Sequence, residues 1–103
     1  MLTQNAKRPL IVVKRIYYDR FLSGEKRHEY RLHRGSFTRR VFYPGREVRL
    51  AYNYNLNRYP SQLARVVSFS IKRADECPTS DYPDIDPAAE IAVIELQLLT
   101  QEE

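Results

Sequence analysis

The densest group of ionisable side chains lies in residues 23–34, SGEKRHEYRLHR, where eight of twelve positions are Lys, Arg, Glu or His. Within it, Lys26, Glu29 and Arg31 follow Gly24 at spacings of two, three and two. A lysine that is partly desolvated among other cations loses proton affinity and can act as a nucleophile or base. A lysine paired with Glu29 instead stays protonated, which suits anion binding or polarisation of a carbonyl. A third interpretation is a solvated cluster of ion pairs that contributes little free energy.

Two short elements precede this motif and must position it. The apolar, β-branched run at residues 10–14 predicts a buried strand. Residues 15–23 predict a short amphipathic helix, and Gly24 stands where helices commonly end in the left-handed conformation. The face of that helix is defined by two pairs at a spacing of four residues, Tyr17 with Phe21 and Tyr18 with Leu22.

From Arg27 onward the polarity alternates, which predicts a strand over residues 27–33. One face carries Arg27, Glu29, Arg31 and His33, and the other carries His28, Tyr30 and Leu32. Because Glu29 and Arg31 lie two residues apart on one face, we expect them to pair. We also expect this pair to line a cleft together with Lys26, which lies at the corner between helix and strand.

Three further segments are typical of strands, at residues 47–54, 63–71 and 90–99, and turn residues separate them. In the first of these, one face carries Val48, Leu50, Tyr52 and Tyr54. In the second, the residues predicted near the core are Leu63, Val67, Phe69 and Ile71, with Arg65 interrupting that face. Five strands with one or two short helices in 103 residues predict a single α+β domain spanning residues 1–103. Its expected architecture is a small mixed β-barrel or half-barrel.

Composition narrows the function classes. The longest apolar runs, such as LIVV and IAVI, fall far short of the roughly 20 residues that a membrane span needs, so no membrane association is expected. The first residues lack a hydrophobic signal core, and a single cysteine, Cys77, fits a reducing compartment, so we expect a cytoplasmic protein. Three glycines and no phosphate-binding loop argue against ATP or dinucleotide chemistry, and no cofactor is expected.

No metal site is expected either. His28 and His33 fall on opposite faces of the predicted strand, so they do not form a chelating pair. The acids Asp81, Asp84 and Asp86 lie in a proline-bearing loop that lacks the central glycine of a calcium loop.

Charge is divided unevenly along the chain. Residues 1–49 hold thirteen Lys or Arg against four acids, a net charge of +9, whereas residues 50–103 hold four against nine, a net charge of −5. Thirteen of the seventeen basic residues are arginine, which suits bidentate phosphate contacts and stacking on bases. Several of the eight tyrosines stand among the arginines, as in RIYYDR and HEYR, and can supply stacking surfaces. An alternative interpretation is that tyrosine fills half-buried strand positions.

The order of strand, short helix and G-x-K-x-x-E-x-R strand resembles the ASCH domain, a branch of the PUA-like superfamily. The matching positions are Gly24, Lys26, Glu29 and Arg31, followed by the YPG turn at residues 43–45 and the closing IAVIEL strand. The resemblance covers about residues 10–99. The family pattern has an acid after the PG turn, where this chain has Arg46. The resemblance implies a PUA-like fold, a cleft beside the helix and motif strand, and RNA or modified nucleosides as ligands.

Two kinds of function are compatible with this resemblance. In the first, the chain is an RNA- or modified-nucleotide-binding module, whose ligand-binding residues are expected to be Lys26, Arg27, Arg31, Arg39, Arg40, Tyr17 and Tyr30. In the second, it is an amidohydrolase that deacetylates N(4)-acetylcytidine or a related acylated nucleoside, or a ribonuclease. The hydrolase reading assigns catalysis to Lys26, with Glu29 orienting it and Glu76 relaying protons. Enzymatic relatives carry threonine where this chain has Glu29. The charge asymmetry favours binding, because a lone nucleoside needs no broad basic surface.

Overall fold

The computed structural model describes residues 8–78 and 84–99. Along the chain the elements are β1 (Leu10–Val12), α1 (Arg15–Ser23), β2 (His28–Leu32), β3 (Glu47–Ala51), β4 (Ser61–Arg73), the 3-10 helix η2 (Ala74–Glu76) and β5 (Glu90–Leu98). The predicted helix and the five predicted strands are confirmed, although β1 and β3 end earlier than expected. No helix in the described ranges is long and apolar enough to cross a membrane.

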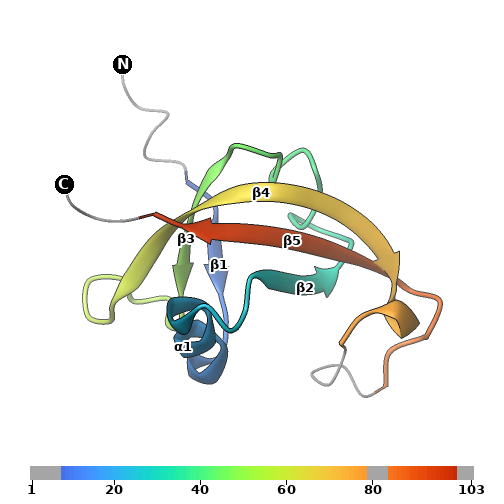
Figure 1. Cartoon of the computed structure of the whole chain (residues 1–103), viewed down its shortest axis with the longest axis horizontal. Coiled ribbons are helices and arrows are strands. Elements are labelled where there is room, and N and C mark those ends of the chain that lie inside the picture. Colours follow the sequence, from blue (N-terminus) through green and yellow to red (C-terminus); the bar gives the residue numbers. More distant parts are fainter. Residues whose placement is uncertain (1–7, 79–83, 100–103) are drawn as a thin grey trace.

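The five strands form one curled sheet in the order β1-β3-β4-β5-β2. β1 runs parallel to β3, and every other neighbouring pair is antiparallel. β4 arches across the molecule with β5 alongside it, while α1 lies beneath the arch (Figure 1). After β1 the chain forms α1 and then β2, which pairs with β5 at the opposite edge of the sheet from β1. The chain then crosses back to form β3 beside β1. The expected α+β half-barrel with one helix is therefore confirmed.

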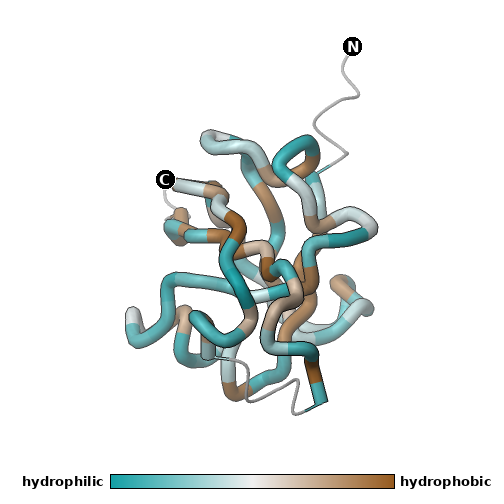
Figure 2. The backbone as a smooth tube through the Cα atoms, turned by 90° about the vertical axis from the view of Figure 1, so that its right-hand side faces the viewer, coloured by the Kyte–Doolittle hydropathy of each residue, from teal (hydrophilic) through white to brown (hydrophobic). Residues whose placement is uncertain are grey.

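The main core fills the concave side of the sheet. Tyr18 and Phe21 of α1 pack there against Ile11, Leu50 and Ile94 from three strands. Hydrophobic and hydrophilic segments alternate along the backbone, with several hydrophobic stretches running through the middle of the molecule (Figure 2). The helix buries Tyr18 and Phe21, whereas Leu22 is exposed, so the predicted pairing of Tyr18 with Leu22 on the buried face is wrong. Positions three residues apart, rather than four, lie closest to the sheet here.

A second, smaller cluster covers the opposite face of β5. Ile91 and Val93 pack there with Ala74 of η2, and Tyr30 and Leu32 of β2 lie against them. Successive side chains of a strand point to opposite faces, so β5 buries alternate residues in each of the two clusters. β5 therefore lies between the two clusters, and it pairs on one side with β4 and on the other with the edge strand β2.

A β-bulge in β4 changes which side chains face the core. The register with β5 shifts between Val66 and Ser68, so Val66 and Phe69 are buried whereas Val67 is 45% exposed. The predicted core position Val67 is therefore wrong, because the register shift separates it from the face that Phe69 occupies. Ile71 lies on the same face as Phe69 but is 44% exposed toward the end of β4, so its predicted place in the core is also wrong. Phe69 is confirmed as a core residue, and Leu63 is half-buried.

Two glycines end or turn the chain as their positive φ angles allow. Gly24, with φ of 87°, ends α1, and its N–H donates to the Phe21 carbonyl at 3.2 Å. Gly45, with φ of 94°, follows Pro44 in a turn closed by the Arg46 N–H and the Tyr43 carbonyl. β3 ends at Ala51, and Tyr54 is 78% exposed, so the prediction that it continues the strand face of Val48 and Leu50 is wrong.

The bulge provides a matched pair of valines for a stability test. Val66→Ala should lower the free energy of unfolding by about 2 kcal/mol, because Val66 is 1% exposed and truncation leaves a cavity. Val67→Ala should change it by less than about 0.5 kcal/mol, since Val67 points outward. Urea denaturation measures both values. Equal losses for the two variants would contradict the register shift.

Candidate functional site

An open cleft of about 570 Å³ lies between α1 and β2. Its lining residues are Lys14, Tyr17, Arg20, Glu25, Lys26, Arg27, His28, Glu29, Tyr30, Arg31 and Pro78. Most come from the helix, the connection after it and the motif strand, and Pro78 follows η2. The expected cleft beside the helix and motif strand is therefore present, and Lys26, Glu29 and Arg31 all line it.

Lys26 lies at the centre of this cleft. Its Nζ donates to the His28 carbonyl and lies 3.8 Å from Glu29 Oε1. Three aromatic rings surround the same atom, with centroids 5.5 Å away in Tyr17, 5.2 Å in Phe21 and 5.1 Å in Tyr30. A carboxylate, a carbonyl and three π faces all stabilise a cation. These contacts therefore favour the charged ammonium over the neutral amine that a nucleophile requires.

Glu29 is the only charged side chain among the buried residues that the structure describes, with 7% of its surface exposed. Its Oε2 accepts a hydrogen bond from Arg31 Nε at 2.5 Å, so the predicted pair is confirmed. The carboxylate therefore lies between two cations, Lys26 and Arg31. A carboxylate this deeply buried costs free energy unless it is paired in this way.

Arg31 also connects the two edges of the sheet. The Pro9 carbonyl accepts from the Arg49 N–H of β3, and the Val13 N–H donates to the Ala51 carbonyl of β3. Odd-numbered residues of this segment therefore direct their backbone groups toward β3. Alternation along β1 therefore directs the Val12 carbonyl away from β3, toward the open edge. Arg31 Nη2 donates to that carbonyl at 2.5 Å, and the guanidinium lies 4.8 Å from the Phe37 ring centroid. A side chain of β2 thus satisfies a carbonyl of β1 across the mouth of the half-barrel.

Lys26 does the same for the open edge of β2. The Arg27 carbonyl and the His33 N–H bond to β5, so the even-numbered residues of β2 direct their backbone groups outward. The outward carbonyl of His28 is the one that Lys26 satisfies. A charged lysine along an edge strand also opposes pairing with another chain. The motif therefore has a structural role: Lys26 and Arg31 cover the two edges, and Glu29 pairs with both cations.

The rim of the cleft is strongly basic. Lys14, Arg20 and Arg27 are exposed there. With Lys26 and Arg31 these give five cations against the two carboxylates Glu25 and Glu29, a net charge of +3. Within the described part of the chain, neither Arg20 nor Arg27 forms an ion pair. The rim therefore presents positive charge to an incoming anion.

Tyr17 and Tyr30 place aromatic surfaces inside this basic rim. Both rings line the cleft and are half-buried. Burial raises the pKa of Tyr30, and Cys77 and Glu29 add smaller effects in the same direction. The phenol therefore stays neutral at physiological pH. Arg20 lies 5.8 Å from the Tyr17 ring centroid, so a cation and an aromatic surface are combined on the helix side.

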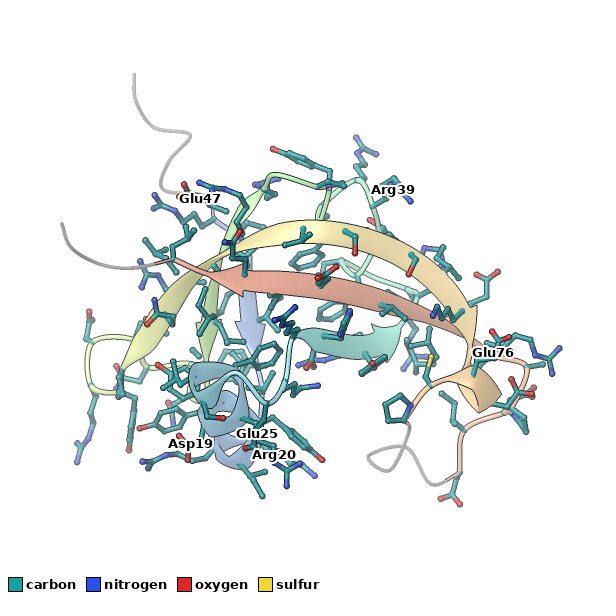
Figure 3. All side chains as sticks on the ribbon, viewed as in Figure 1. Asp19, Arg20, Glu25, Arg39, Glu47 and Glu76 are labelled. Atoms are coloured by element: carbon teal, nitrogen blue, oxygen red, sulfur yellow. The ribbon has the colours of Figure 1, made fainter. Side chains whose placement is uncertain are left out.

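Three of the predicted site residues lie away from this cleft. Arg39 donates to the Phe69 carbonyl at 2.9 Å and, like Arg40, is not among the described residues that line the cleft. Figure 3 shows Arg39 and Arg20 on opposite sides of β4 and β5. Glu76 Oε1 accepts from the Arg73 N–H at 3.1 Å, and Figure 3 places it at the far end of β4. The structure thus does not bring Glu76 near Lys26.

Sequence reasoning missed several contributors to the cleft. Lys14, Tyr17 and Arg20 recur every three residues, a spacing that places side chains along one side of a helix, so periodicity could have revealed the two basic ones. The periodicity places Phe21 on the amphipathic face of the helix but does not reveal its contact with Lys26. Nothing in the sequence marks the Val12 carbonyl as a partner of Arg31.

The side chains that could bind a metal ion are dispersed in the part of the chain that the structure describes. In residues 8–78 and 84–99, no three His, Cys, Asp or Glu side chains are grouped to hold a metal ion. Asp81 lies outside the described residues. Cys77 is a free thiol, and burial is the largest cause that raises its pKa.

Comparisons of the chain with models of protein families, with curated proteins and with solved structures found no match.

The buried pair can be tested against an exposed pair of the same chemistry. Arg31→Ala should lower the free energy of unfolding by about 3 kcal/mol, because it leaves Glu29 buried with only Lys26 nearby. Arg65→Ala, which removes an exposed partner of Glu47 3.4 Å away, should cost less than about 1 kcal/mol. Chemical denaturation with matched m-values compares the two variants. A loss for Arg31→Ala no larger than that for Arg65→Ala would show that Glu29 does not depend on its partner.

Proposed function

We propose that this chain is an RNA- or nucleotide-binding module that holds its ligand in the cleft between α1 and β2. The observation that carries the proposal is the combination of a basic rim with two tyrosine rings in one cleft. Phosphates are bound by Lys and Arg, and bases stack on aromatic side chains. The cleft volume of about 570 Å³ is within the range of small-ligand sites, so one nucleotide can occupy it.

The proposed roles follow from position. Arg20 and Arg27 at the rim contact phosphate, and Lys26 and Arg31, already held by Glu29, add positive potential at the floor. A base stacks on Tyr17 or Tyr30. Because every base has a π face, such a site accepts different bases. Hydrogen bonds between base edges and His28, or base N–H groups donating to the Glu25 carboxylate, add selectivity.

The architecture supports membership of the ASCH branch of PUA-like domains as part of the same proposal. A strand, a short helix ended by glycine and a motif strand follow one another, and a cleft lies beside them. A cytoplasmic location fits an RNA ligand and the free thiol of Cys77.

Binding is favoured over hydrolysis by the surroundings of Lys26. An attacking amine must be neutral, whereas Lys26 donates to a carbonyl and faces a carboxylate and three rings. The proton relay assigned to Glu76 would have to act from the far end of β4, where that carboxylate accepts a backbone hydrogen bond. The two carboxylates that line the cleft are Glu29 and Glu25, and Glu76 is not among the residues that line it.

Salt dependence tests the binding proposal. A labelled single-stranded hexauridylate should bind with an affinity that falls steeply as salt rises, because bound cations release counterions from RNA. The double variant Arg20→Ala/Arg27→Ala should flatten the slope of log K against log salt by roughly 1.4, about 0.7 for each lost phosphate contact. Fluorescence anisotropy across a salt series measures the slope.

Arg40→Ala is the matched control, since Arg40 is exposed but lies outside the cleft. Its salt slope for hexauridylate should equal that of the unmodified protein. Absence of binding at low salt, or a flat salt slope, would refute the proposal. An effect of Arg40→Ala on hexauridylate binding as large as that of the double variant would move the site away from the cleft.

A turnover assay separates binding from the enzymatic alternatives. Pure protein incubated with N(4)-acetylcytidine should release no cytidine, and incubated RNA should stay intact. Lys26→Arg should keep ligand binding, because arginine preserves the charge and the donor to the His28 carbonyl but is not a nucleophile. Cytidine release that Lys26→Arg abolishes would establish the amidohydrolase instead, and RNA cleavage would establish a ribonuclease. A Glu29→Thr variant extends the test, since threonine is the residue of the enzymatic relatives.

A further inference from the structure

A second group of tyrosines and arginines lies on the other side of α1 from the cleft. It consists of Arg15 at the start of α1 and of Tyr52, Tyr54, Arg58 and Tyr59 in the loop between β3 and β4, and we call it the loop surface. Figure 1 shows this yellow-green loop at the lower left, beside α1. The proposed nucleotide site uses none of these residues.

The rings of the loop surface are packed into an ordered array. Tyr52 lies edge-to-face against Tyr59 at 5.9 Å between centroids and against the buried Tyr18 at 5.0 Å. Arg15 lies 4.8 Å from the Tyr52 centroid, and Arg58 lies 5.9 Å from that of Tyr59. Burial is the main cause that raises the pKa of Tyr18, so the base of the array remains neutral. The pair of tyrosines, Tyr52 and Tyr59, is thus flanked by an arginine on each side.

Local hydrogen bonds hold the loop in shape. The Asn55 carbonyl accepts from the N–H groups of both Arg58 and Tyr59, which closes one helical turn. The Asn53 side chain accepts from the Asn55 N–H at 2.9 Å. A loop fixed in this way presents its side chains at little further entropic cost on binding.

Tyr54 is the most exposed large apolar or aromatic side chain described, at 78%. A tyrosine ring in water, with no core to fill, is available for stacking. Residues 52–60 contain one arginine and no acid, and the nearest helical carboxylate, Asp19, pairs with Arg15 at 3.7 Å. The surface is therefore positive to neutral, and its polar residues are mainly asparagines. That composition is complementary to a polyanion with π faces.

The loop surface and the cleft are separated only by the helix. Tyr17 lines the cleft, whereas its neighbour Tyr18 contacts Tyr52. An α-helix with its side chains is about 10–12 Å across, a distance that a few nucleotides of single-stranded RNA span.

We infer that the loop surface is a second stacking site, which binds the part of a single-stranded RNA that extends from the cleft across α1. Tyr54 stacks on a base, and Arg15 and Arg58 contact the flanking phosphates. This inference rests on the proposed function, because the cleft supplies the first contact. Its physiological ligand is an oligonucleotide rather than a free nucleoside, since a single nucleoside cannot reach both sites.

Ligands of two lengths test the inference separately from the proposed function. Tyr54→Ala should weaken binding of single-stranded hexauridylate by at least about fivefold, the lower range for loss of one base–aromatic stack. The same variant should leave uridine 5′-monophosphate binding unchanged, because the mononucleotide occupies the cleft alone. Tyr54→Phe should retain the affinity for hexauridylate, since stacking needs the ring and not the hydroxyl. Calorimetric titration measures both ligands.

Tyr43→Ala is the matched control. Tyr43 is also exposed and also carries a stacked arginine, Arg46 at 5.2 Å, but it lies in the turn before β3. The inference is overturned if Tyr54→Ala leaves hexauridylate binding unchanged, or if Tyr43→Ala weakens it equally. In either case the proposed function still stands if the protein binds the mononucleotide. If the unmodified protein binds neither ligand, the inference and the proposed function are both overturned. Binding of a protein partner through Tyr54, with no effect on RNA, also overturns the inference.

Discussion

The structure depends on one buried carboxylate, Glu29, held between Lys26 and Arg31. A curled sheet that does not close into a barrel leaves two edges with unpaired carbonyls. Here each cation satisfies a carbonyl on one of those edges, His28 on β2 and Val12 on β1. Two cations placed so close together would repel each other without the anion between them. Glu29 therefore allows both edges to be covered by cations.

The same arrangement accounts for the electrostatics of the cleft. Lys26 and Arg31 are immobilised by backbone carbonyls and by Glu29, so their charges are fixed before a ligand arrives. Preorganised cations bind an anion without further ordering of their side chains. They are poor nucleophiles for the same reason, because each contact that orders the lysine also stabilises its charged form. A structural role and a binding role are thus compatible in these residues, whereas a structural role and nucleophilic catalysis conflict.

The helix α1 presents different chemistry on its two flanks. Its cleft side carries Tyr17 and Arg20, and the side facing the β3–β4 loop carries Arg15 beside Tyr52. Between them, Tyr18 and Phe21 anchor the helix to the core. A nine-residue helix is too short to be stable alone, so its position comes from these two rings and from its Gly24 end. Its burial therefore orders both surfaces together.

The sequence by itself determined the order and type of the elements, the end of α1 at Gly24 and the pairing of Glu29 with Arg31. These features follow from local periodicity, from the conformational freedom of glycine and from the alternation of side chains along a strand. Each of these depends only on residues that are close together in the sequence. Only the tertiary structure decided which face of β4 is buried, because a bulge after Val66 shifts the register and no local signal marks it. It also decided that Glu76 and Arg39 lie apart from the cleft, and that the Val12 carbonyl meets Arg31. Such contacts depend on how the sheet curls, which is set by pairing between strands far apart in the chain.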